Sequence, residues 1–114
     1  STSYNTTSDY RLKTDVVDLV DATSRLMNLK PRRFRWKGSI DGHTPVDGFI
    51  AHEVAEVVPE AVVGEKNAVT SSGEVQAQGM DSSKLVPLLT AALQEMNARV
   101  AQLEQIIAKM NSGI

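Results

Sequence analysis

The sequence predicts an α+β protein: a small mixed domain of helices and strands at residues 8–80, followed by a long helix at 81–114 that forms a parallel coiled coil. Three observations support this. Short apolar runs with period two, bounded by turn residues, predict strands in the first part. Apolar spacings of three and four predict short helices between them, and an unbroken heptad pattern fills the last third. A chain of 114 residues is long enough for one small domain and an appendage.

Residues 1–7, STSYNTT, are polar and without periodicity, so we expect the tail of an upstream segment or a linker. The next six residues, SDYRLK, are chemically more informative. A serine hydroxyl becomes a nucleophile when a base takes its proton, and a lysine can be that base if burial or nearby positive charge destabilises its ammonium form. Arg11 could supply such charge to Lys13, or it could pair with Asp9. Taken alone, a serine five residues before a lysine is weak evidence, and a capped turn followed by a solvated lysine is the favoured interpretation.

Thr14–Leu29 shows helical spacing towards its end, with Asp18 or Asp21 as the capping residue. Pro31 stops this helix and favours an extended conformation for the residue before it. The predicted buried face consists of Leu19, Ala22, Leu26 and Leu29.

Arg32–Lys37, RRFRWK, alternates basic and aromatic residues and predicts a strand with one buried face. Packing of Phe34 and Trp36 in the core is the favoured interpretation, because the surrounding chain is acidic. The alternative is a nucleic-acid surface of cations and aromatic rings, which would show a steep salt-dependent affinity for DNA.

Gly38–Gly48 is rich in turn residues and predicts a hairpin loop, and Val46–Ala51 predicts the strand that follows. His52–Val58 has helical spacing and predicts a short helix that closes near Pro59. His52 and Glu53 could orient or tune a nearby group, or could simply lie on the surface of this helix. The remaining predictions are a strand at 61–63, a turn at 64–67, a loop at 69–73 and a return strand at 74–80.

The last third has N-cap residues at 81–83, Pro87 in the first turn and Gly113 at the end, as expected for one long helix. A seam of heptad a and d positions is too narrow to be buried by one helix alone, so it predicts partner helices. Arg99 at g would face Glu104 at the next e of a neighbour, which favours a parallel arrangement. The alternative is one long helix lying on its own domain. The seam residues are Val86, Leu89, Leu93, Met96, Val100, Leu103, Ile107 and Met110.

The composition limits the classes of function. Twelve basic and fourteen acidic residues give a net charge of −2, which is no general signal for polyanion binding. The absence of cysteine excludes disulfides, thiolate metal sites and cysteine nucleophiles. No apolar run is long enough to span a membrane, and His43 has no second histidine nearby. We therefore expect no metal, no cofactor, no nucleic-acid partner and no membrane partner.

Four blocks in this order and spacing resemble the peptidase S74 family, the C-terminal intramolecular chaperone domains of bacteriophage tail spikes and tail fibres, including endosialidases. The blocks are SDYRLK at 8–13, LKPRRFRWK at 29–37, GFIAHEVAEVVPEAV at 48–62 and MDSSKLVPLLTAALQEMNARVAQLE at 80–104. His52 departs from the pattern, because the family usually has glutamine there.

The resemblance implies a homotrimer that holds three chains in register while an upstream fibre segment folds, and that then cuts itself off. It assigns the nucleophile to Ser8 and the dyad lysine to Lys13, with Asp9, Arg11, His52 and Glu53 as supporting candidates. Residues 1–7 would end the mature fibre protein. Cleavage at Thr7–Ser8 is favoured, because attack by Ser8 on the preceding carbonyl passes through a five-membered ring. The alternative bond, Ser8–Asp9, would need a serine from another chain.

A physical rationale accompanies this expectation. Intertwined β-rich chains fold slowly because their contacts are non-local, whereas a coiled coil forms locally and fixes the number of chains first. Linking the chains raises their effective concentration to about the millimolar range. We expect the domain to act in the host cytoplasm during assembly and to be released from the mature virion. The other hypothesis is a structural trimerisation tip of a fibre that does not cleave.

Overall fold

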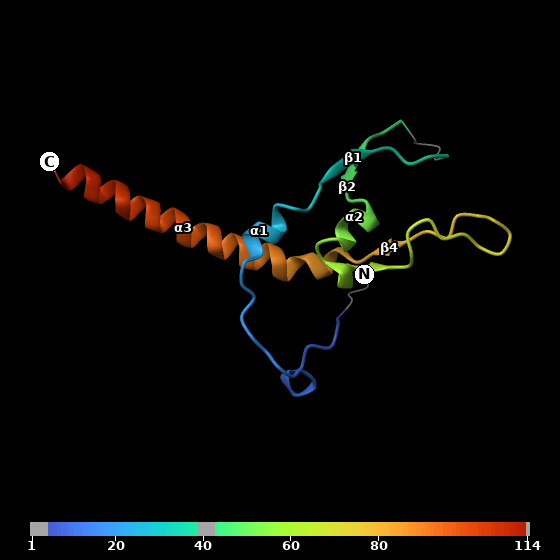
Figure 1. Cartoon of the computed structure of the whole chain (residues 1–114), viewed down its shortest axis with the longest axis horizontal. Helices are drawn as coiled ribbons and strands as arrows, with labels where there is room; N and C mark the ends of the chain where they lie inside the picture. Colours follow the sequence, from blue (N-terminus) through green and yellow to red (C-terminus); the bar gives the residue numbers. More distant parts are fainter. Residues whose placement is uncertain (1–4, 39–42, 114) are drawn as a thin grey trace.

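The computed structural model describes residues 5–38 and 43–113. The chain is elongated, with extents of 74 × 44 × 33 Å and a radius of gyration of 20.3 Å. A compact domain of this length would have a radius of gyration of about 13 Å. Figure 1 shows the cause: helix α3 (Val86–Ser112) projects from a small body, and an N-terminal segment and two hairpins extend away from it.

The N-terminal segment, residues 5–20, is called the arm below. It contains one turn of 3-10 helix, η1 (Tyr10–Leu12), and has no regular secondary structure from residue 14 to residue 20, with a bend at Asp15. Helix α1 comprises only Ala22–Leu26, and its N-cap residue is Asp21, one of the two predicted caps. A start at Asp18 is therefore wrong, and the helix ends before Leu29. Two features explain the difference. The residues between Asp15 and Asp21 are mostly β-branched, which lowers helix propensity, and both aspartates have left-handed backbone with φ of 55° and 56°.

The first hairpin pairs β1 (Arg32–Phe34) with β2 (Val46–Gly48) in antiparallel register. The predicted strand at Arg32–Lys37 is shorter than expected. Phe34 is half-buried, whereas Trp36 is 65% exposed and meets the Phe34 ring edge-on with centroids 5.1 Å apart. The expectation that Trp36 packs in the core is wrong, because it lies beyond the end of the strand. Part of the predicted loop, residues 39–42, lies outside the described residues.

The second half of the body begins with α2 (Ala51–Ala55) and η2 (Pro59–Ala61). The predicted strand at 46–51 thus ends earlier, and the predicted helix at 52–58 starts one residue earlier and closes sooner. A second antiparallel pair joins β3 (Val62–Val63) to β4 (Gly79–Met80). The predicted return strand at 74–80 is reduced to β4 and a single bridge between Val69 and Val75.

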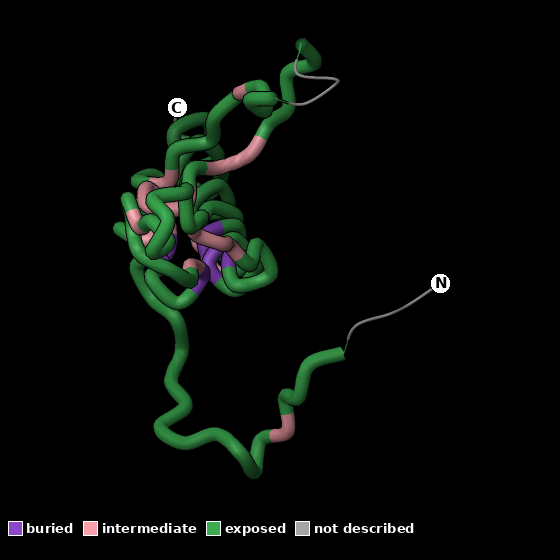
Figure 2. Tube along the Cα trace, turned by 90° about the vertical axis from the view of Figure 1, so that its right-hand side faces the viewer, coloured by how far each residue is buried: buried purple, intermediate pink, exposed green. Residues whose placement is uncertain are grey.

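The buried core is small and lies where α1, α2, η2 and the first turns of α3 meet. Figure 2 shows the buried residues gathered in one cluster, with the arm extending away from it. Partly buried side chains such as Leu26, Leu29 and Phe49 pack around this cluster. The fully buried residues are Ala22, Val54, Val58, Ala61, Leu85, Leu88 and Ala92.

Helix α3 begins and ends close to the predicted positions. A 3-10 turn, η3 (Ser82–Leu85), precedes it, and the Asp81 carboxylate accepts a hydrogen bond from the Ser83 N–H at 3.1 Å. Pro87 lies in the first turn and Gly113 follows the last residue, as predicted. Only the first turns contact the body, and all residues from 96 to 113 are exposed. Within the described ranges, no helix is long and apolar enough to cross a membrane.

The architecture agrees with the predicted mixture of helices and strands followed by a long C-terminal helix. The association of α3 with other copies stays a prediction.

Candidate active site

The structure brings Ser8 and Lys13 into direct contact. The Lys13 ammonium Nζ donates a hydrogen bond to the Ser8 Oγ at 2.7 Å. The intervening turn η1 makes this possible, because the backbone N–H groups of Leu12 and Lys13 donate to the carbonyls of Asp9 and Tyr10, both at 3.1 Å. A spacing of five residues thus becomes a contact between two side chains.

The Asp9 carboxylate stabilises the start of this turn. Its Oδ1 accepts a hydrogen bond from the Arg11 backbone N–H at 2.9 Å. The Arg11 guanidinium also binds both carboxylate oxygens, with Nε to Oδ1 at 3.0 Å and Nη2 to Oδ2 at 2.8 Å. The Arg11 guanidinium, followed by its backbone N–H, lowers the pKa of Asp9. Of the two alternatives for Arg11, the structure shows the pair with Asp9.

The serine–lysine pair lines a pocket between the arm and the body. The pocket has a volume of about 650 Å³ and includes Thr7, the residue on the other side of the favoured scissile bond. Its body wall carries three charged side chains: Arg25 of α1, Glu60 of η2 and Lys84 of η3. In the single chain Ser8 and Lys13 are both exposed, so water reaches the site freely.

The other two supporting candidates lie elsewhere. His52 and Glu53 are on α2, outside the residues that line this pocket. The Glu53 carboxylate binds the Arg32 guanidinium, with Nε to Oε1 at 3.0 Å and Nη2 to Oε2 at 2.8 Å. Arg32 therefore lowers the pKa of Glu53. Any supporting role of His52 stays a prediction.

The basic residues of RRFRWK are partly neutralised within the chain. In addition to the Arg32–Glu53 pair, the Arg33 Nε binds the Asp47 carboxylate of the facing strand at 2.8 Å. A row of cations available for a nucleic-acid backbone would not be paired in this way. These contacts favour a hairpin that stabilises itself.

Sequence analysis did not identify the body wall of the pocket. Arg25, Glu60 and Lys84 come from three separate elements, and they come together because α1 packs against α3 and η2 packs against η3. No local pattern around these residues signals such a contact. The Ser8–Lys13 pair was accessible to sequence reasoning because one turn separates its members.

All eight predicted seam residues of α3 are exposed in the single chain, by 45–72% of their surface. The face of α3 that contacts the body is a different one, formed by Leu88, Ala92 and Glu95. The seam is therefore free for contacts beyond the chain.

The fold and the pair of side chains describe a small α+β domain with a serine–lysine contact at its N-terminal end and an exposed apolar helix at the other. Residues 8–63 match the Peptidase_S74 family model, which is described as the chaperone of endosialidase. This part of the chain belongs to that family. The match begins at Ser8 and includes three of the four blocks quoted above, while the block at 80–104 lies beyond it. No curated protein matches the chain.

Family membership supports an intramolecular chaperone role. The family name also joins this role to peptidase activity.

Proposed function

We propose that this chain is an intramolecular chaperone of a phage tail spike or fibre, that it trimerises through α3, and that it releases itself by cutting at Ser8. The observation that carries the proposal is the 2.7 Å contact between Lys13 Nζ and Ser8 Oγ. This contact lies at the first residue of the matched family segment. The domain would act in the host cytoplasm during assembly and leave the mature virion afterwards.

The proposed reaction starts when Lys13 is neutral. The hydrogen bond then reverses, so that Ser8 Oγ–H donates to Nζ, and Nζ takes the proton as Oγ attacks the carbonyl carbon of Thr7. The Thr7–Ser8 C–N bond breaks, and Nζ returns the proton to the leaving amine of Ser8. The product is an ester between Thr7 and the Ser8 oxygen. One water molecule hydrolyses this ester to a Thr7 carboxylate and restores the Ser8 hydroxyl.

The exposure of the site gives a reason for coupling cleavage to assembly. Burial of a lysine favours its neutral amine, which is the form that can act as a base. In the single chain Lys13 is exposed. Contact with neighbouring copies would exclude water from the pair, so cleavage would follow trimer formation.

The test is the intact mass of the denatured chain, expressed with a tag ahead of Ser1. We expect the wild type to be cut, and Ser8→Ala and Lys13→Ala to slow cleavage by at least about 10³-fold. Lys66→Ala is the matched control, because Lys66 lies in the turn after β3 and outside the pocket. The fragment masses distinguish a cut at Thr7–Ser8 from one at Ser8–Asp9.

The second candidate is a structural trimerisation tip without protease activity. The exposed seam of α3 favours it as strongly as the first, since the seam requires association and not cleavage. It takes the place of the first proposal if the tagged wild type keeps its full mass while light scattering shows a trimer.

A further inference from the structure

The arm exposes a run of aliphatic side chains. In the five residues from 16 to 20, four are large and apolar, and between 43% and 85% of each is exposed: Val16, Val17, Leu19 and Val20. Figures 1 and 2 both show the arm standing away from the body. Left-handed aspartates at 15 and 21 bracket the run and define its backbone. Leu19 lines the pocket against the body of its own chain, whereas Val16, Val17 and Val20 are left largely in water. Such exposed apolar side chains indicate a surface that another molecule covers.

The body contains an apolar groove that suits aliphatic side chains such as those of the arm. It has a volume of about 480 Å³ and lies between the end of α1, the segment after it and the start of α3. Leu89 belongs both to this groove and to the exposed seam of α3, so the groove opens onto the surface where a second copy would pack. The lining residues are Leu26, Met27, Leu29, Pro31, Phe49, Ser82, Leu85 and Leu89.

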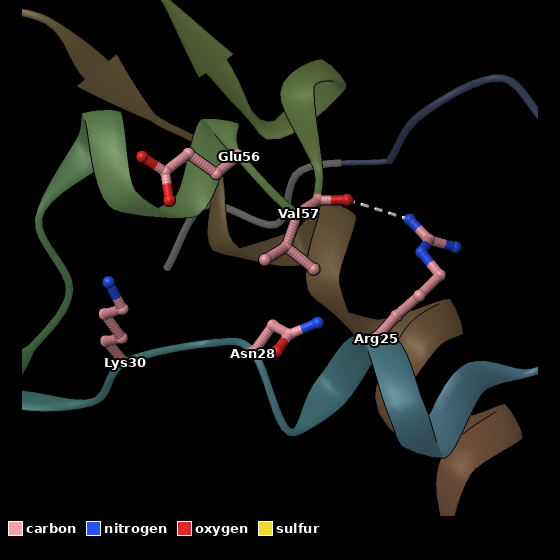
Figure 3. A pocket seen from close by; sticks show the side chains of 5 residues that line it. All are labelled: Arg25, Asn28, Lys30, Glu56 and Val57. Atoms are coloured by element: carbon pink, nitrogen blue, oxygen red, sulfur yellow. Dashed lines mark hydrogen bonds between the residues drawn. The ribbon is translucent and has the colours of Figure 1, made fainter.

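The charges beside the groove are complementary to those of the arm. Asp15 and Asp18 lie among the aliphatic residues of the arm, and Asp21, the N-cap residue of α1, follows them. The segment that forms one wall of the groove also borders a pocket of about 400 Å³ with two cations, Arg25 and Lys30, and one carboxylate, Glu56 (Figure 3). Opposite charges on two apolar surfaces favour one alignment of the surfaces over others.

We propose that residues 16–20 of the arm dock in this apolar groove of a neighbouring copy, so that the copies exchange arms. The proposal rests on the proposed association through α3. The arm points away from the groove of its own chain. In Figure 1 it leaves α1 towards one side of α3, whereas the segment that follows α1 and lines the groove leaves towards the other side.

Arm exchange has a consequence for the candidate active site. Ser8 and Lys13 belong to the same arm as the docking residues. Docking therefore carries the serine–lysine pair against the neighbouring copy, which supplies the cover that the single chain lacks. Cleavage at Thr7–Ser8 would leave the docked arm in place, because the cut lies ahead of it.

The absence of cysteine in the chain allows a clean cross-linking test. Two single variants, Val17→Cys and Met27→Cys, are made in a Ser8→Ala background, so that the result does not depend on cleavage. They are unfolded, mixed in equal amounts, refolded together and oxidised. A disulfide requires Cα atoms within about 7 Å, so it reports a close contact. We expect a linked pair of one chain of each kind, identified by the mass of the joined peptides.

The control mixes Val17→Cys with Val75→Cys, since Val75 is equally exposed but lies in the loop between β3 and β4. The control should give no linked pair. A Val17→Cys/Met27→Cys double variant that closes a disulfide only within one chain overturns arm exchange. If light scattering shows a trimer but no linked pair forms, arm exchange is contradicted, whereas association through α3 is still supported. If the protein is a monomer, both arm exchange and association through α3 are contradicted. Self-cleavage is tested independently, by the mass of the tagged wild type.

Discussion

The body and the two extensions of this chain differ in how far a single copy completes them. In the body, seven residues are fully buried, and no buried polar side-chain atom among the described residues lacks a hydrogen-bond partner. In the arm and along the distal half of α3, apolar side chains are exposed at regular positions. The body thus has a small core of its own beside an open apolar groove, whereas the arm and the distal half of α3 bury no apolar side chain within the single chain.

The distal half of α3 needs a second surface because of the way helices are stabilised. An isolated helix in water is marginal, and most helical stability in proteins comes from packing of an apolar face. Residues 96–113 of α3 receive no such packing from the body. Their seam repeats with the period of a coiled coil and not with that of a surface helix. The part of α3 that the body does not support is therefore the part that the heptad pattern would stabilise by association.

Charges placed on the seam of α3 should have the largest effect on association. Leu93→Glu together with Val100→Glu would bring carboxylates together along the axis of a parallel bundle. In the single chain both side chains are exposed, so the body should be unaffected. We expect association to be lost at micromolar concentration, as measured by light scattering, with the circular dichroism of the body elements retained.

A matched control adds the same two charges elsewhere on α3. Gln94→Glu and Gln105→Glu lie at heptad positions b and f, away from the seam. This variant should associate like the wild type. If the seam variant also associates normally, the exposed seam is not the interface, and the alternative of a helix that serves its own domain gains support.

The second prediction separates the two faces of α3. Leu88 is 3% exposed and belongs to the core, and truncating a buried leucine to alanine typically costs about 2–5 kcal/mol. In a core this small, Leu88→Ala should unfold most of the body at any protein concentration. Leu103→Ala removes the same atoms from an exposed seam position, so its effect should appear only as a weaker, concentration-dependent association. Thermal melts at two concentrations distinguish the two results.

Different parts of the fold were predictable from the sequence to different degrees. The long helix and its ends could be predicted, because heptads, N-cap residues and Gly113 act locally. The β1–β2 hairpin could be predicted for the same reason. The sequence did not decide between a helix that starts after Asp18 and one that starts after Asp21, since the apolar spacing fits both starts. Apolar spacing alone does not specify which surface covers a side chain.

The contacts of the candidate site also differ in how far they could be predicted from the sequence. The contact of Ser8 with Lys13 spans one turn and was within reach of sequence reasoning. The body wall with Arg25, Glu60 and Lys84 was not, because these residues are separated by up to 59 positions and meet only through packing. The N-cap position of α1 was predicted, because Asp21 was one of the two aspartates proposed. The side chain of Asp21 makes no cap hydrogen bond, however, and Glu95 of α3 accepts these bonds in its place.

The smallest expected effect concerns this cap, which joins the body to α3. The Glu95 carboxylate accepts hydrogen bonds from the N–H groups of Ala22 and Thr23 at 3.0 and 2.8 Å, and from the Thr23 hydroxyl at 2.7 Å. Loss of a helix cap of this kind should lower the melting temperature by about 4–8 °C. We expect that shift for Glu95→Ala, and none for Glu65→Ala in the exposed turn after β3.

The pH dependence distinguishes a charged cap from simple packing. The Thr23 hydroxyl and then the backbone N–H groups of Ala22 and Thr23 lower the pKa of Glu95 below its ordinary value of 4.5. Since the folded state favours the ionised carboxylate, the stabilisation is fully present above pH 4.5 and is lost as the pH falls through the lower folded-state value. The difference in melting temperature between wild type and Glu95→Gln should shrink over that acidic range. A difference that stays constant down to low pH would mean that the Glu95 side chain acts through its packing, and that its charge does not join α1 to α3.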